Sequence, residues 1–202
     1  EEEIAFIKKN KNRIMRHIEA EGVIYYPCSF FQEKLILAQL LGKYDYSMHV
    51  LVEVADLENN KNKVGKLLAY LLKVHPILRS AIKLIGGKAY QYLIDKGTAQ
   101  SAMYTQQSID TLSGSVNWAG YLKNILDEES VAFSQQSPLA RIRALAYQGK
   151  LYILMNVNHV IADASSIKII EASISKFFSG LDLDGPMVDS VSPKSFFCSG
   201  WG

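Results

Sequence analysis

The feature that most constrains the fold of this chain is an apolar run late in the sequence. Residues 151–157 read LYILMNV and are almost all nonpolar, which is the pattern of a β-strand buried on both faces. Residues 165–178, SSIKIIEASISKFF, have the spacing of an amphipathic helix, with Ser165 or Ser166 as its N-cap. We therefore expect a buried strand that passes through a short connection into a helix.

The connection contains a histidine and an aspartate, His159 and Asp163. A tight turn beside a helix N-terminus can hold an imidazole rigidly in a cleft, as a general base requires. Asp163 could orient the imidazole or reach an arginine and brace the connection, and we favour bracing because several arginines lie in expected strands. No Gly-x-Ser-x-Gly occurs, so a covalent serine mechanism lacks its nucleophile. The alternative is that the two residues form an ordinary structural pair.

The rest of the chain alternates between helical and strand-like patterns. Apolar periodicity and β-branched runs predict the following elements: helices at 3–20, 29–41 with a Ser N-cap, 62–75 and 117–129; a strand at 46–55; a hairpin at 78–94 around Gly86-Gly87; a second hairpin at 139–161 around Gln148-Gly149; and a surface excursion at 95–115. This order predicts an α/β (α+β) fold with a mixed β-sheet flanked by helices.

Composition argues against several classes of protein. The chain has 22 basic and 20 acidic side chains, a formal charge of +2, so no overall field favours nucleic acid or a membrane as partner. No apolar run approaches the ~20 residues of a membrane span. The two cysteines, Cys28 and Cys198, have no metal-ligand spacing. We therefore expect no bound metal and a reducing, cytoplasmic setting.

Several segments together resemble a known family. NHVIADA at 158–164, preceded by SPLARIRALAYQGK, resembles the His-His-x-x-x-Asp-Gly motif and leading hairpin of the condensation domains of nonribosomal peptide synthetases. FFQEKLILAQLL and LLAYLLKVHPILRSAI resemble the family's opening helix and its helix-to-strand segment. The match covers about residues 25–200, in the same order. The superfamily also contains chloramphenicol acetyltransferase and other coenzyme A-dependent acyltransferases, so a chloramphenicol acetyltransferase-like lobe is the implied fold.

The resemblance implies roles for individual residues. His159 matches the second histidine of the motif, which is the catalytic one in the family. Asp163 matches the motif aspartate, which is structural and forms a salt bridge with an arginine. Arg79, Arg141 and Arg143 are the candidates for that arginine.

Two positions differ from the family motif. Asn158 stands in place of the first histidine, and Ala164 in place of the final glycine. An asparagine side chain can hydrogen-bond where the first histidine would. The same differences leave open a non-catalytic alternative, in which the chain is a docking or gating module for carrier proteins.

The implied reaction is amide-bond formation between an acyl or peptidyl thioester on a donor carrier protein and an aminoacyl group on an acceptor carrier protein. The substrates are tethered by phosphopantetheine, which belongs to the carrier proteins, so the chain itself is expected to bind no cofactor. Residues 1–202 would be the N-terminal lobe, ending before the C-terminal lobe and inactive without it, with further synthetase domains adjacent. A compact coenzyme A-dependent acyltransferase of the chloramphenicol acetyltransferase type, which would be a trimer, is the other enzymatic alternative.

Overall fold

The computed structural model describes residues 18–20, 22–42, 46–104, 110–112, 117–128 and 137–180. Its strands are β1 Ile18–Ala20, β2 Val23–Pro27, β3 Ser47–Val54, β4 Ser80–Ile85, β5 Lys88–Leu93, β6 Asp110–Leu112, β7 Ala140–Tyr147 and β8 Lys150–Asn158. Its helices are α2 Phe30–Leu40, α3 Leu57–Asn60, α4 Val64–Val74, α5 Lys96–Met103, α6 Trp118–Glu128 and α7 Ala164–Phe178, with 3₁₀ turns η1 Lys61–Lys63 and η2 Pro76–Arg79. Within these residues no helix is long and apolar enough to cross a bilayer.

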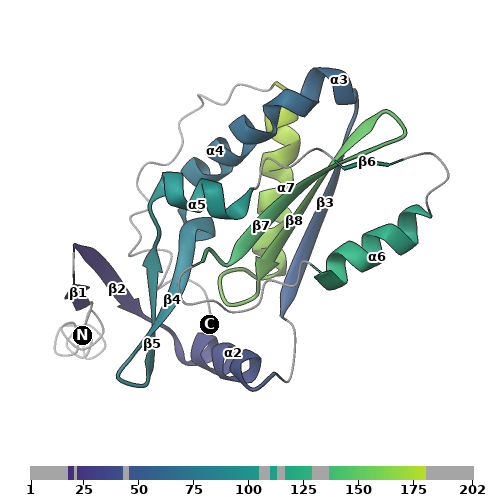
Figure 1. The fold of residues 1–202 in the computed structure, drawn as a ribbon. Helices are drawn as coiled ribbons and strands as arrows, with labels where there is room; N and C mark the ends of the chain where they lie inside the picture. Colours follow the sequence, from purple (N-terminus) through teal and green to yellow (C-terminus); the bar gives the residue numbers. More distant parts are fainter. Residues whose placement is uncertain are drawn as a thin grey trace, which may run out of the picture.

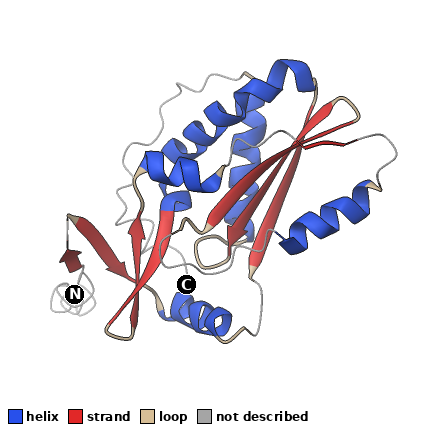
Figure 2. Ribbon diagram, in the orientation of Figure 1, coloured by secondary structure: helices blue, strands red, loops and turns tan. Residues whose placement is uncertain are grey.

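The strands form two four-stranded sheets rather than one (Figures 1 and 2). The first has the order β1-β2-β5-β4, and the second has the order β3-β8-β7-β6, in which β6 is parallel to β7 and the other pairs are antiparallel. A backbone hydrogen bond from Leu139 N to Ser80 O (3.0 Å) joins β4 to the residue before β7, and beyond it the two strands diverge (Figure 1). The expected α/β class is confirmed, but the strands are divided because β4 and β7 do not continue to pair.

Strand β8 lies inside the second sheet and is covered on both faces, as its sequence predicts. One face carries Leu151, Ile153, Met155 and Val157, which are fully buried in the core that includes residues of α4 and α7. The other face packs Leu154 against α6 in a smaller cluster. Figure 2 shows these helices around the sheet.

Most of the expected elements are present. The helices expected at 29–41, 62–75, 117–129 and 165–178 are α2, α4, α6 and α7; the strand expected at 46–55 is β3; and the two hairpins are β4–β5 and β7–β8. Gln148 and Gly149 have φ values of 50° and 73°, as a two-residue hairpin turn requires.

Two expectations about secondary structure were wrong. Residues 18–20, expected to end a helix, form β1 and pair with β2; the remainder of that helix, 3–17, lies outside the described residues. The surface excursion at 95–115 contains α5, whose N-cap is Asp95. The Asp95 carboxylate accepts from Thr98 N at 3.1 Å. The composition of α5 is polar and only Ala99 and Met103 are buried, so the apolar periodicity that signals a helix is weak there.

Candidate active site

The connection between β8 and α7 brings His159 and Asp163 to the N-terminal end of α7. The Oδ1 atom of Asp163 accepts hydrogen bonds from Ser166 N at 2.7 Å and from Ser166 Oγ at 2.6 Å. Asp163 is therefore the N-cap of α7, and the expectation that Ser165 or Ser166 caps the helix was wrong: Ser166 donates to the cap instead. The hydroxyl and N–H of Ser166 lower the pKa of Asp163, because both stabilise the charged carboxylate.

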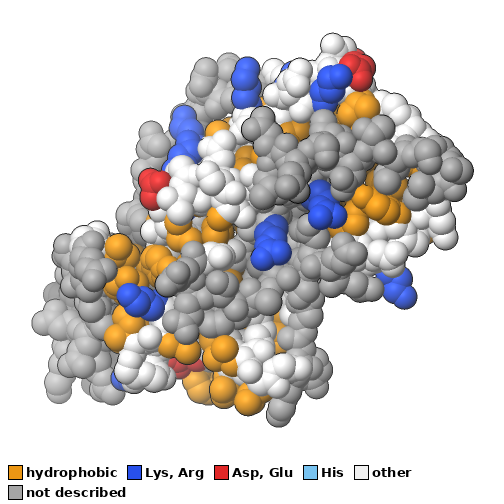
Figure 3. Space-filling model, in the orientation of Figure 1, with side chains coloured by type: hydrophobic (Ala, Val, Ile, Leu, Met, Phe, Trp, Pro, Cys, Tyr) orange, Lys and Arg blue, Asp and Glu red, His pale blue; other side chains and the backbone are white. Residues whose placement is uncertain are grey.

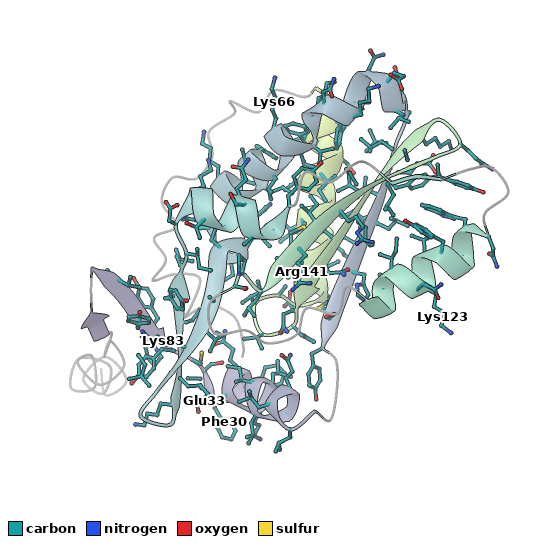
Figure 4. All side chains as sticks on the ribbon, viewed as in Figure 1. Phe30, Glu33, Lys66, Lys83, Lys123 and Arg141 are labelled. Atoms are coloured by element: carbon teal, nitrogen blue, oxygen red, sulfur yellow. The ribbon has the colours of Figure 1, made fainter. Side chains whose placement is uncertain are left out.

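The expected arginine partner of Asp163 is not found in the described part of the chain. Arg141 lies near the start of β7 and is exposed (Figure 4), Arg143 is partly buried on the same strand, and neither forms an ion pair with Asp163. Arg79 donates from Nη1 to Ile94 O at 3.5 Å, and its buried Nε has no partner among the described residues. Within the described residues, the aspartate thus braces the connection through α7.

The imidazole of His159 is held by the backbone of its own turn. Its Nδ1 lies 2.7 Å from Ala162 O, and its backbone N–H donates to Tyr46 O at 2.8 Å. A carbonyl oxygen only accepts hydrogen bonds, so Nδ1 carries the proton, and Nε2 is the unprotonated nitrogen of the neutral ring. The ring of Phe31 approaches the imidazole edge-on at 6.5 Å between centroids. A partly exposed histidine fixed in this tautomer can accept a proton at Nε2, which is the capacity of a general base.

Asn158 is fully buried at the end of β8. Its Oδ1 accepts from Val160 N at 3.0 Å and from Gln39 Nε2 at 3.1 Å, while its Nδ2 donates to Gln39 Oε1 at 3.0 Å. Ala164 is the first residue of α7 and does not have a positive φ. The two departures from the family motif are therefore compatible with an ordered turn.

Helix α2 contributes a second glutamine to the turn. The Nε2 atom of Gln32 donates to Val160 O at 2.9 Å and to Gln91 Oε1 at 3.1 Å. Gln91 in turn donates to Ser80 Oγ at 2.7 Å. The role of these glutamines was not predicted from the sequence. The Ser29-x-x-Gln32 spacing of a capping box signals the start of the helix, but it does not indicate the contact with Val160.

His75 forms a separate contact that is structural. Its Nε2 lies 2.8 Å from Ser173 Oγ, and the Ser173 hydroxyl donates to Ile169 O at 2.9 Å. The hydroxyl proton is committed to that carbonyl, so the imidazole is the donor and does not activate the serine. Burial lowers the pKa of His75, and the contact joins the end of α4 to α7.

Comparison with known proteins finds sequences that are similar to this chain. The chain is 25% identical over 171 residues to surfactin synthase subunit 2 of Bacillus subtilis (strain 168), and 21% identical over 169 residues to subunit 1. These matches cover 81% and 82% of the chain but 4% of each relative, so the chain spans a small part of their length. No model of a protein family matches the chain.

Solved structures show the same fold. The first condensation domain of the calcium-dependent antibiotic synthetase, in complex with a substrate analogue, aligns with 80% of this chain and 40% of its own at 16% identity and a TM-score of 0.61. A four-domain nonribosomal peptide synthetase bound to AMP and glycine aligns with 82% of this chain and 13% of its own at 18% identity and a TM-score of 0.60. The fold is that of a condensation domain. The fold implied by the resemblance of the sequence to condensation domains is therefore confirmed.

Proposed function

We propose that residues 1–202 are the N-terminal lobe of a condensation domain and that His159 is its catalytic base or positioning group. The observation that carries this proposal is the hydrogen bond from Nδ1 to Ala162 O (2.7 Å), which leaves Nε2 as the basic nitrogen. Condensation domains are acyltransferase-type enzymes that form amide bonds, and this geometry fits that chemistry.

In the proposed reaction, the acceptor amine attacks the carbonyl carbon of the donor thioester. A C–N bond forms, Nε2 of His159 accepts a proton from the attacking nitrogen, and the tetrahedral intermediate collapses by breaking the C–S bond. The departing thiolate of the donor arm takes up this proton from His159, which returns the imidazole to its neutral form. The phosphopantetheine arms of the donor and acceptor carrier proteins present both substrates, and the chain itself holds no cofactor.

The exposed surface of α2 is a candidate contact site for other parts of a longer protein. Five large hydrophobic side chains at this helix and its C-cap are exposed (Figure 3): Phe30, Phe31, Leu37, Leu40 and Leu41. Apolar patches of this kind mark interaction surfaces. The candidates for contact are the C-terminal lobe, the carrier proteins and adjacent synthetase domains. The cytoplasmic setting expected from the cysteines belongs to the same proposal, as does inactivity of the isolated lobe.

The test replaces His159 by alanine in the full-length synthetase that contains this chain, with peptide formation on the acceptor carrier protein measured by mass spectrometry. Loss of a general base lowers such rates by about 10²–10⁴-fold. His49→Ala is the control, because His49 is exposed on β3 and bonds to Asn156 rather than to the turn. An unchanged rate for His159→Ala would favour the non-catalytic docking module. A trimeric isolated chain that transfers acyl groups from coenzyme A would favour the compact acyltransferase.

A further inference from the structure

Helix α2 holds the peptide units on both sides of His159. Before the histidine, Gln39 forms a reciprocal amide pair with Asn158, with N···O distances of 3.1 and 3.0 Å. After it, Gln32 donates to Val160 O at 2.9 Å. The two glutamines are seven residues apart and therefore lie on the same side of the helix. The catalytic turn is thus attached at two points to a helix that precedes it by more than a hundred residues.

The pair between Gln39 and Asn158 satisfies both the donor and the acceptor of a buried amide. Asn158 is fully buried, and its Oδ1 also accepts from Val160 N at 3.0 Å. Its Nδ2 donates to Gln39 Oε1. Loss of Gln39 would remove one acceptor for Asn158 Nδ2 and one donor to Asn158 Oδ1, and the loss of hydrogen bonds to a buried amide favours its rotation. Rotation would release Val160 N, which is part of the same turn.

The turn also determines the protonation pattern of His159. Nδ1 reaches Ala162 O only while residues 159–162 keep their conformation, which is closed by a backbone hydrogen bond from Ile161 N to Asn158 O at 3.0 Å. A change in the conformation of Asn158 therefore alters the hydrogen bond between His159 Nδ1 and Ala162 O. That hydrogen bond keeps the proton on Nδ1 and leaves Nε2 basic. Catalytic geometry is sensitive to such shifts, since a misplacement of about 1 Å costs roughly 10²-fold in rate.

We infer that Gln39 is a positioning residue for His159, acting through the side chain of Asn158. This inference rests on the proposed function of His159. It assigns the pairing with Gln39 as the reason why asparagine serves at position 158.

The experiment compares Gln39→Leu, Asn158→Leu and the double variant in the full-length synthetase. We expect each single change to lower kcat by about 10- to 100-fold with a much smaller change in KM, in line with the sensitivity of positioned groups. The double variant should be no slower than Asn158→Leu, because the two residues act through one contact. Lys34→Gln, an exposed residue of the same helix, is the control and should leave kcat unchanged. Gln39→Glu keeps the size and the acceptor while removing the donor, and should also lower kcat.

A second readout is the tautomer of His159, followed by ¹⁵N chemical shifts in the same variants. Gln39→Leu should raise the fraction of ring protonated at Nε2. Normal kcat and an unchanged tautomer in Gln39→Leu would overturn the inference, as would a lower melting temperature with no change in kcat well below it. If His159→Ala retained full activity, the proposed function would fail, while the ¹⁵N shifts would still report whether Gln39 positions the imidazole.

Discussion

Replacing Asp163 by asparagine and by alanine separates two ways in which this carboxylate could hold the start of α7. In the structure, Oδ1 accepts from Ser166 N and Oγ at 2.7 and 2.6 Å, at the head of a helix of 15 residues. An asparagine amide oxygen can accept the same two hydrogen bonds, whereas alanine can accept neither. A salt bridge to an arginine, by contrast, would be lost in both variants.

The magnitudes of the two cases differ enough to be measured. Asparagine and aspartate are comparable N-caps, and loss of the charge beside the helix dipole costs about 0.3–1 kcal/mol, so Asp163→Asn should lower the free energy of unfolding by about 0.5 kcal/mol. Asp163→Ala removes the cap and should cost about 1–2 kcal/mol. If the carboxylate were paired with a buried arginine, either change would cost about 3–5 kcal/mol.

The pH dependence provides a second check with a defined sign. Hydrogen bonds from Ser166 lower the pKa of Asp163 in the folded protein. The charged carboxylate therefore contributes stability that is fully present above the unfolded pKa of about 3.9 and is lost as the pH falls through the lower folded value. Asp163→Asn has no group to titrate there, so its difference from the unmodified chain should shrink as the pH falls below about 4.

Urea unfolding followed by circular dichroism, at pH 7 and at pH 3.5, measures the cost of Asp163→Asn, the cost of Asp163→Ala and the pH dependence of both. A cost for Asp163→Asn equal to that of Asp163→Ala, or a cost above about 3 kcal/mol, would refute capping as the main role of this residue.

Three further predictions concern stability and reactivity. Ile125→Ala should lower the free energy of unfolding, measured by urea titration, by about 2–5 kcal/mol, because Ile125 packs α6 against the second sheet. Lys123→Ala is the control, because Lys123 is exposed on the same helix (Figure 4). Equal effects of the two substitutions would contradict this packing. Neither Gly149 nor Gly65 has an atom within 4 Å of an added Cβ, but Gly149 has a φ of +73°. Gly149→Ala should therefore lower the free energy of unfolding by about 1 kcal/mol through backbone strain, whereas Gly65→Ala in α4 should raise it by about 0.5 kcal/mol. Effects of the same sign would count against the backbone explanation. Burial raises the pKa of Cys28 to about 12, so only about one thiol in ten thousand is ionised at pH 8; peptide mass spectrometry should find iodoacetamide labelling of Cys28 much slower in the folded chain than in urea, and equal labelling would show that the thiol is not protected.

Local signals in the sequence were sufficient for most of the elements that build the site. The apolar run at 151–157 became β8 because a strand covered on both faces needs nonpolar residues on both. The glycine pair at 86–87 and the Gln148-Gly149 turn closed the two hairpins, since these positions adopt positive φ. Ser29 began α2 through a capping box. These features depend on residues a few positions apart, which is why they could be read directly.

Other elements were missed where local and tertiary preferences differ. Helix α5 has a polar composition and is anchored by Ala99 and Met103 alone among its residues, so its pattern resembles that of a loop. Strand β1 forms through pairing with β2, although its residues suit the helical periodicity of the segment before them. The division into two sheets depends on where β4 and β7 stop pairing, which no short stretch of sequence encodes.

The sequence by itself determined that His159 would follow a buried strand and precede a helix, because the hydrophobic period changes at that point. Only the tertiary structure decided which groups surround it. Asp163 caps α7, since Ser166 offers it two donors within one turn, and none of the described arginines forms an ion pair with it. Asn158 pairs with Gln39, 119 residues away, because folding places α2 beside the end of β8. A contact over that separation gives no periodic pattern in the sequence.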